Sequence, residues 1–260
     1  MSSRPLAIVT GASAGIGREL TRILAREGHD LVLVARREAQ LTELADELKT
    51  RYDAASTIAA VDLAAAGAAD DVMAVLAGRA VDVLVNNAGF GGVGAFCTRS
   101  RDDDMRMVTV NVVALTDLTK LLVPGMMQRR RGRVLNVAST AAFQPGPFMA
   151  VYYATKAYVL SLSQALAEEL SGTGVTVTCL CPGPTESEFH AVAGTDAQPL
   201  TATPLTMSAS SVAEAGYRAM MRGKLVEVPG LHNKIGAQTI RIAPRRAVLK
   251  VVRRLHPAEH

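Results

Sequence analysis

The segment that most constrains the fold is a glycine-rich turn near the N-terminus, at residues 10–17 (TGASAGIG). It follows an apolar run at residues 6–10 that predicts a buried strand, and the residues after it are apolar at helical spacing. Because glycine lacks a Cβ, the backbone of such a turn can approach a pyrophosphate, and the N–H groups that open the next helix bind anions. The spacing is Gly-x-x-x-Gly-x-Gly, not the commoner Gly-x-Gly-x-x-Gly. The turn predicts a dinucleotide site at Gly11, Ser13, Ala14, Gly15, Ile16 and Gly17.

Apolar runs alternate with helical patterns along the rest of the chain. Strands are predicted at residues 6–10, 31–35, 58–61, 81–86, 133–138, 175–181 and 225–228. Helices are predicted at about 16–27, 41–48, 68–76, 102–127, 150–170 and 211–222. This alternation implies right-handed crossovers and the α/β class: a single-domain, doubly wound parallel sheet of seven strands, with helices on both faces, over residues 1–260. Residues 182–208, rich in Pro, Thr, Ser and Gly, predict a loop that covers the substrate.

The composition suits this fold and argues against several other classes. Apolar residues make up 49% and aromatic residues 4%, so small aliphatic side chains must fill the interior. Six cations and one acid follow residue 240, and they account for the net charge of +4, so the main body has no basic face for nucleic acid. Three cysteines without a disulfide pattern favour a reducing, cytoplasmic compartment. We expect no metal site, signal peptide or membrane-spanning helix.

The end of the second predicted strand indicates which dinucleotide binds. NAD-binding folds usually place an acid there, whereas this chain has Ala35 followed by Arg36 and Arg37. An acid would repel a 2′-phosphate, and a guanidinium pairs with it, so the sequence favours NADPH over NADH. The alternative is two solvated arginines that open a helix. A second basic residue before Gly15 is missing, because that position is Ala14.

Tyr152 and Lys156 lie four residues apart on a predicted helix and therefore share a face. A nearby ammonium, together with the positive ring of an oxidised nicotinamide, is expected to lower the pKa of the phenol. Tyr152 then donates a proton to a carbonyl oxygen as hydride reaches the carbon, while Ser139 hydrogen-bonds the same oxygen. These residues predict NADPH-dependent reduction of a carbonyl group, although a Tyr-x-x-x-Lys pair alone also arises by chance.

Five features in order resemble the short-chain dehydrogenase/reductase family: TGASAGIG at 10–17, NNAG at 86–89, Asn111, Ser139, and YYATK at 152–156. The resemblance covers residues 6 to about 190. It implies a catalytic triad of Ser139, Tyr152 and Lys156, extended by Asn111, which would hold a water that passes protons to Lys156. Tyr152 and Lys156 would also contact the nicotinamide end of the cofactor, with Lys156 on its ribose.

The resemblance implies further cofactor contacts at Asp62, Asn86, Ala88, Gly89, Pro182, Gly183, Thr185 and Ser187. Asp62 would lie near the adenine, although a helix cap explains it equally well. Thr185 and Ser187 stand where relatives usually have Val and Thr. The helices at 102–127 and 150–170 pair subunits in many relatives, so a homodimer or homotetramer is expected. The segment CPGPTESEF, the Ala35-Arg36-Arg37 end and the extended C-terminus look most like a bacterial branch of general-purpose reductases, which is also similar to ketoacyl and hydroxysteroid reductases.

Two questions stay open from the sequence. The basic C-terminal extension at about 231–260 has an apolar stripe of Val248, Val251, Val252 and Leu255, which either lies on an anionic membrane or partner, or packs within the protein. The activity also has alternatives, namely an epimerase or dehydratase on the same fold and a non-catalytic NADP(H)-binding redox sensor. The intact Ser139–Tyr152–Lys156 set disfavours the sensor, because binding alone needs no tuned phenol.

Overall fold

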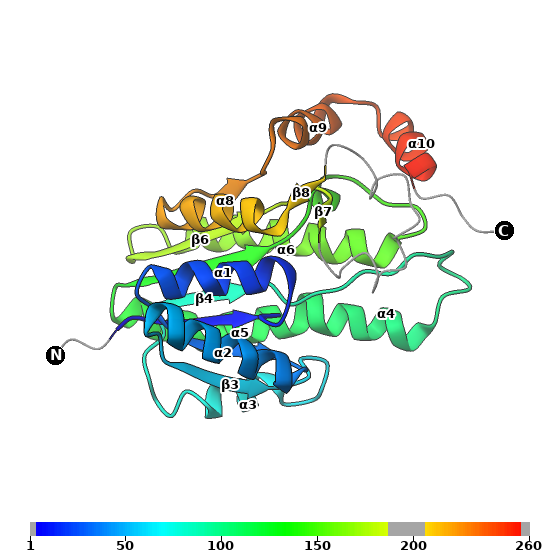
Figure 1. Ribbon diagram of the computed structural model, residues 1–260. Coiled ribbons are helices and arrows are strands. Elements are labelled where there is room, and N and C mark those ends of the chain that lie inside the picture. The colour runs from blue at the N-terminus through cyan, green and yellow to red at the C-terminus, as the bar shows by residue number, and fades with distance from the viewer. Residues whose placement is uncertain (1–3, 187–205, 256–260) are drawn as a thin grey trace.

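The computed structural model describes residues 4–186 and 206–255, and its centre is a parallel seven-stranded sheet (Figure 1). The strand order is β3-β2-β1-β4-β5-β6-β9. Strands β2 and β3 are added on one side of β1 and strands β4 to β9 on the other, so the switch point lies between β1 and β4. The strands are β1 (Leu6–Thr10), β2 (Asp30–Ala35), β3 (Ser56–Ala60), β4 (Val83–Asn86), β5 (Gly132–Val137), β6 (Val175–Leu180) and β9 (Val226–Glu227). The predicted fold class and all seven predicted strands are confirmed.

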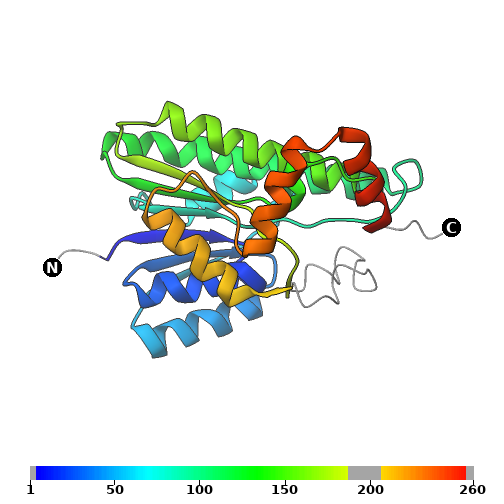
Figure 2. The same cartoon turned by 90° about the horizontal axis from the view of Figure 1, so that it is seen from above.

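Helices cover both faces of the sheet and enclose two apolar cores (Figure 2). One face carries α1 (Gly15–Arg26), α2 (Glu38–Tyr52) and α8 (Ala209–Met221). The other face carries α3 (Ala68–Ala74), α4 (Arg101–Val108), α5 (Leu115–Gln128) and α6 (Ala150–Glu169). Leucine, valine and alanine side chains dominate both cores, as the low aromatic content requires.

The long helix predicted at 102–127 is present but has a wider turn in its middle. Ser100 caps it, because its hydroxyl accepts a hydrogen bond from the Asp103 N–H at 3.3 Å. Between α4 and α5, residues Thr109–Ala114 form a π-helical segment. Such segments are frequent at functional sites, and this one contains Asn111.

The predicted loop at 182–208 has structure at both of its described ends. Strands β7 (Thr185–Glu186) and β8 (Met207–Ser208) form a short parallel ladder, so the prediction of an irregular loop is wrong at these positions. Two-residue strands leave no periodic pattern that a sequence could show. Residues 187–205, and with them Ser187, lie outside the described residues.

Two helices at the C-terminus, α9 (Leu231–Ile242) and α10 (Arg245–Leu255), lie over the carboxyl end of the sheet (Figures 1 and 2). Val248 and Val252 of α10 are 9% and 4% exposed and pack with Met107, Met149 and Tyr153. Val251 lies on the opposite side and is 56% exposed. Val248 and Val252 of the predicted apolar stripe therefore pack on their own chain, whereas Val251 does not.

Candidate active site

The glycine turn adopts a conformation that only glycine allows without strain. Gly11 and Gly15 have φ of +66° and +54°, in the left-handed region. A Cβ at Gly17 would overlap the carbonyl oxygen of Gly11, so the turn closes tightly on the start of α1. The N-cap residue Ala14 has no side-chain acceptor for the first turn of α1. The N–H groups of this turn are therefore placed to bind an anion.

A second turn, after β4, is fastened to the glycine turn by Thr10 and Asn87. The Thr10 hydroxyl accepts hydrogen bonds from the backbone N–H groups of Asn87 and Ala88, both at 3.0 Å. The Asn87 amide donates to the carbonyl oxygens of Thr10 and Gly11 at 3.0 and 3.2 Å. Neither residue was among the predicted site residues, although Asn87 lies within the NNAG motif that could have indicated it.

Asn86 lies below this turn, and its side chain faces the interior. It is 3% exposed, and its amide donates to Thr119 Oγ1 at 3.0 Å and to Asn136 Oδ1 at 2.9 Å. The Asn136 amide continues this buried chain to the Ser163 hydroxyl at 2.9 Å. The structure thus directs the Asn86 side chain away from the predicted cofactor side, where Ala88 and Gly89 remain.

Arg37 connects the end of β2 to the glycine turn, because its guanidinium donates to the Ser13 hydroxyl at 3.2 Å. Arg36 is exposed beside it. The structure therefore brings the two predicted arginines to the nucleotide end of the site. Asp62 accepts from the Ala64 N–H at 3.1 Å and pairs with Arg106 of α4 at 2.6 Å. Its carboxylate thus caps a local turn, a role similar to the helix cap that the sequence offered as the alternative to an adenine contact.

The predicted catalytic side chains meet where β5 ends and α6 begins. Ser139 follows β5, accepts from the Ala141 N–H at 3.1 Å, and is hydrogen-bonded to the Tyr152 hydroxyl. Tyr152 and Lys156 are 8% and 5% exposed. The Lys156 ammonium lies 5.8 Å from the centre of the Tyr152 ring and donates to the Val137 carbonyl at 2.9 Å.

The pKa values of the two groups move in directions set mainly by burial. Burial raises the pKa of Tyr152 to about 12, and the hydrogen bond with Ser139 opposes that rise. Burial also lowers the pKa of Lys156 to about 8. The expected net lowering of the pKa of Tyr152 is therefore not found among the protein's own groups, because desolvation of the phenolate dominates. At neutral pH the phenol is protonated, which is the form that a proton donor requires.

Asn111 uses its whole amide to join three elements. Its Nδ2 donates to the Phe90 carbonyl and to Thr155 Oγ1, both at 3.0 Å, and its Oδ1 accepts from the Phe90 N–H at 3.1 Å. Thr155 in turn donates to the Tyr152 carbonyl at 2.7 Å. Oδ1 keeps a second acceptor site, so the water that Asn111 was expected to hold stays a prediction. A Cβ at Gly89 would lie 2.9 Å from Asn111 Oδ1 and 3.4 Å from Lys156 Nζ, so this glycine allows the close approach.

The turn after β6 completes the edge of the site. The Pro182 carbonyl accepts from the Thr140 N–H at 2.8 Å, which fixes the turn against the segment after Ser139. The buried Thr185 hydroxyl donates to the Gly183 carbonyl at 2.9 Å. A side chain at Gly183 would overlap that of Asn233, so α9 packs directly on this turn.

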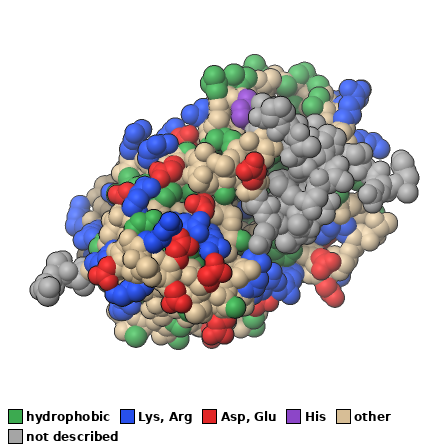
Figure 3. All heavy atoms as spheres, viewed as in Figure 1, with side chains coloured by type: hydrophobic (Ala, Val, Ile, Leu, Met, Phe, Trp, Pro, Cys, Tyr) green, Lys and Arg blue, Asp and Glu red, His purple; other side chains and the backbone are tan. Residues whose placement is uncertain are grey.

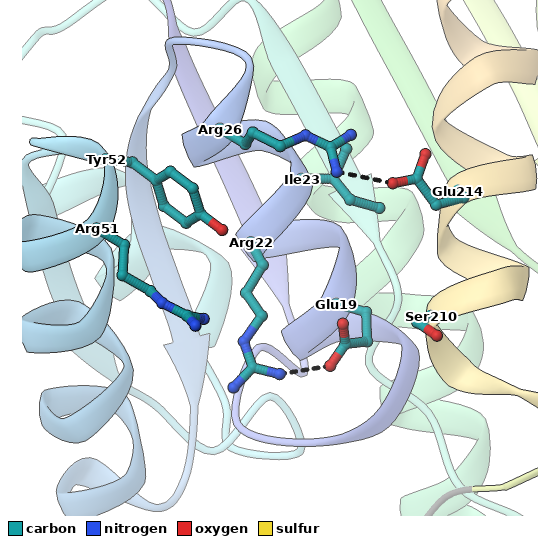
Figure 4. Close-up of a pocket in the computed structure, with 8 residues that line it drawn as sticks. All are labelled: Glu19, Arg22, Ile23, Arg26, Arg51, Tyr52, Ser210 and Glu214. Carbon is teal, nitrogen blue, oxygen red and sulfur yellow. Dashed lines mark hydrogen bonds and ion pairs between the residues drawn. The ribbon is translucent and has the colours of Figure 1, made fainter.

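A surface hollow lies apart from this site, between α1, α2 and α8 (Figure 4). Its charged side chains are already paired: Arg22 with Glu19 at 2.6 Å, and Arg26 with Glu214 at 2.9 Å. It lies on the α1 side of the sheet, whereas Tyr152 and Lys156 belong to α6 on the opposite side. Within the described residues, no group of three or more metal-ligand side chains converges.

Comparisons with known proteins agree with this geometry. Residues 5–198 match the family model of the short chain dehydrogenases. The very-long-chain 3-oxoacyl-CoA reductase of Aspergillus fumigatus is 39% identical over 175 residues, which cover 66% of this chain but 51% of that protein. The chain thus spans about half the length of this relative.

Two solved structures match along nearly the whole chain. A short-chain dehydrogenase from Sphingobium yanoikuyae, in complex with NADPH, is 34% identical with a TM-score of 0.84, and the match covers 98% of this chain and 99% of that one. A bulky-bulky ketone specific alcohol dehydrogenase from Comamonas testosteroni is 30% identical with a TM-score of 0.80, covering 99% and 98%.

Proposed function

Because the chain belongs to the short-chain dehydrogenase/reductase family, we propose that it is an NADPH-dependent oxidoreductase that reduces a ketone or aldehyde to an alcohol. The observation that carries the proposal is the arrangement around Tyr152: a buried, protonated phenol with the Ser139 hydroxyl hydrogen-bonded to it and the Lys156 ammonium beside its ring.

The nucleotide end fits NADPH. The uncapped first turn of α1 and the closed glycine turn would hold the pyrophosphate, and Arg36 and Arg37 would pair with the 2′-phosphate. The NADPH complex of the Sphingobium relative supports this assignment. When bound, the cofactor supplies the hydride, and the protein supplies orientation and the proton.

The chain's own residues account for the proton. Ser139 orients the carbonyl oxygen of the substrate, and Tyr152 transfers its phenolic proton to that oxygen as hydride reaches the carbon. The phenolate that remains is stabilised by the positive charge of Lys156, which holds its proton below its pKa of about 8. A redox sensor that only binds NADP(H) needs no such proton donor. The names of the relatives, a reductase and an alcohol dehydrogenase, favour carbonyl reduction over epimerisation or dehydration.

We propose a substrate with an apolar body next to the carbonyl. Phe90, Met149 and Val93 belong to the apolar cluster around Tyr152, so an acyl chain or bulky ketone suits these surroundings. The names of the Aspergillus and Comamonas relatives, a 3-oxoacyl-CoA reductase and a bulky-ketone dehydrogenase, point to the same classes.

The test is NADPH oxidation, followed by loss of nicotinamide absorbance, with a panel of ketones, aldehydes and 3-oxoacyl thioesters. Tyr152→Phe should abolish turnover and leave NADPH binding intact. Tyr158→Phe, on the exposed side of the same helix, is the matched control and should keep wild-type turnover. Tight NADPH binding without turnover of any carbonyl compound would instead support the sensor.

We also propose a homodimer or homotetramer formed through α4, α5 and α6. The run Arg101–Gln128 is long and apolar enough to span a membrane by length and composition, but half of its most apolar stretch is buried inside the molecule. Val113 and Leu121 on its outer side are 52% and 40% exposed, an apolar surface that a second copy would cover. Light scattering should show an oligomer that Val113→Glu weakens, whereas Val251→Glu on α10 should not. A monomeric wild type would refute this proposal.

Cytoplasmic location stays a proposal, supported by the three free cysteines. For the C-terminal segment we propose a role on its own chain in place of peripheral membrane contact, because Val248 and Val252 point inward.

A further inference from the structure

We propose that α10 forms a cationic rim beside the substrate entrance and selects carbonyl substrates that carry an oxyanion, a carboxylate or a phosphate, over neutral ones. The inference rests on the proposed reductase function and names its substrate class.

The first step is the position of α10 relative to Tyr152. Val248 and Val252 belong to one buried cluster with Tyr152, Tyr153 and Met149. The helix therefore packs on the start of α6, where the substrate carbonyl must approach the phenol. A substrate longer than a few atoms would extend past this helix.

The second step is the loop that α10 contacts. The Arg253 guanidinium lies 5.7 Å from the centre of the Phe148 ring, a distance suited to a cation–π contact. Phe148 stands four residues before Tyr152 and has a φ of +64°, a conformation that a bulky side chain rarely adopts. Its carbonyl accepts from the Gly94 N–H at 2.9 Å. Arg253 thus lies where the loops after β4 and β5 meet, and strained residues of this kind concentrate at functional sites.

The third step is charge. The α10 sequence RRAVLKVVRRL has five cations and no acid. Arg246, Lys250 and Arg253 recur at i, i+4 and i+7, so they share the exposed face of α10, and of the three it is Arg253 that contacts the Phe148 ring. No ion pair joins any of the five to another side chain within residues 4–186 and 206–255. Figure 3 shows blue side chains gathered at this end of the molecule. Charges that are not satisfied inside the described protein are suited to an anionic group on the substrate.

The experiment compares pairs of substrates that share the reacting carbonyl, one member anionic and the other neutral. One pair is a 3-oxoacyl thioester of coenzyme A and the same acyl group on neutral N-acetylcysteamine; the other is an aromatic keto acid and its methyl ester. The first pair probes a phosphate and the second a carboxylate. Variants are Arg253→Gln, the triple variant Arg246→Gln/Lys250→Gln/Arg253→Gln, and the charge-matched control Arg222→Gln at the end of α8.

Each exposed ion pair changes affinity by roughly two- to fivefold, so the three cations together should give a preference on the order of tenfold in kcat/KM. We expect wild type to prefer the anionic member of at least one pair by that factor, through KM, and salt to reduce the preference. The triple variant should lose it while kcat for the neutral member stays unchanged. Arg253→Lys should retain most of it.

Equal kcat/KM ratios in wild type and the triple variant would overturn the inference, as would a wild type that prefers neither anionic member. In both cases turnover of the neutral ketones leaves the proposed reductase function standing. Wild type that reduces no member of either pair but does reduce other carbonyl compounds would overturn the inference alone, and no turnover of any carbonyl compound would overturn both.

Discussion

Lys156 is placed where its charge is costly, and replacing it should make the protein more stable while it destroys activity. The side chain is 5% exposed, and burial lowers its pKa from 10.5 to about 8. At about 1.4 kcal/mol for each tenfold change in proton affinity, this difference lowers the free energy of unfolding by about 3 kcal/mol at neutral pH. Lys156→Met removes the charge and keeps the apolar stem. It also leaves the Val137 carbonyl without its donor, which costs about 1 kcal/mol.

The net expectation is a gain of about 2 kcal/mol in the free energy of unfolding at pH 7. The direction with pH follows from the lowered pKa. Below pH 8 the folded protein carries the buried ammonium and bears the full cost. Between pH 8 and 10.5 the unfolded chain binds more protons than the folded one, so wild-type stability rises with pH. The advantage of the variant must therefore shrink across this window.

Urea unfolding followed by circular dichroism, at pH 7.0 and at pH 9.5, measures the effect. Lys120→Met, on the exposed side of α5, is the control and should change stability little at either pH. Because Tyr152 is the same in both proteins, its own titration cancels in the comparison. A Lys156→Met variant that is less stable than wild type at pH 7, or whose gain is the same at both pH values, would refute the reasoning.

Three further predictions concern the two ends of the site. Arg36→Asp should shift the ratio of kcat/KM for NADPH and NADH toward NADH by about tenfold or more, because an acid repels the 2′-phosphate; an unchanged ratio counts against this role. Gly89→Ala should lower kcat by about tenfold or more with little change in melting temperature, since its Cβ would displace the Asn111 side chain. Thr155→Val removes the hydroxyl between Asn111 and Tyr152, so kcat should fall with a smaller change in KM, and the free energy of unfolding should fall by about 1–2 kcal/mol. Thr155→Ser keeps a hydroxyl and should restore both kcat and stability. Equal effects of the two variants would argue for packing alone.

The elements that the sequence predicted well are those with a strong local pattern. Strands such as β1 and β2 are buried on both faces, so they read as continuous apolar runs between turn signals. The π-helical segment at Thr109–Ala114 was not predicted, because widening one helical turn leaves no periodic trace. Helix α9 also lacked a clear signal, since Leu231, Ile235 and Ile242 place apolar side chains on its exposed side.

Among the site residues, those within local motifs were predicted, and those that depend on contacts between distant segments were not. Ser139, Tyr152 and Lys156 stood in recognisable motifs and the structure brings them together. The role of Asn87 depends on hydrogen bonds to Thr10, 77 residues away, and only the folded chain shows them. Asn86 stays a predicted cofactor contact, but only the folded chain shows that its side-chain amide donates to Thr119 of α5 and Asn136 of β5 in the interior.

The pKa of Tyr152 shows why residue spacing alone misleads about chemistry. A lysine four residues away predicted an acidic phenol, yet the Lys156 ammonium is engaged by a carbonyl and the phenol lies in an apolar cluster. Desolvation then outweighs the neighbouring charge and keeps the proton on Tyr152 at neutral pH. Reduction consumes that proton, whereas oxidation of an alcohol must begin from the phenolate that these surroundings disfavour. We therefore expect the rate of alcohol oxidation to rise with pH over the range in which the phenol loses its proton.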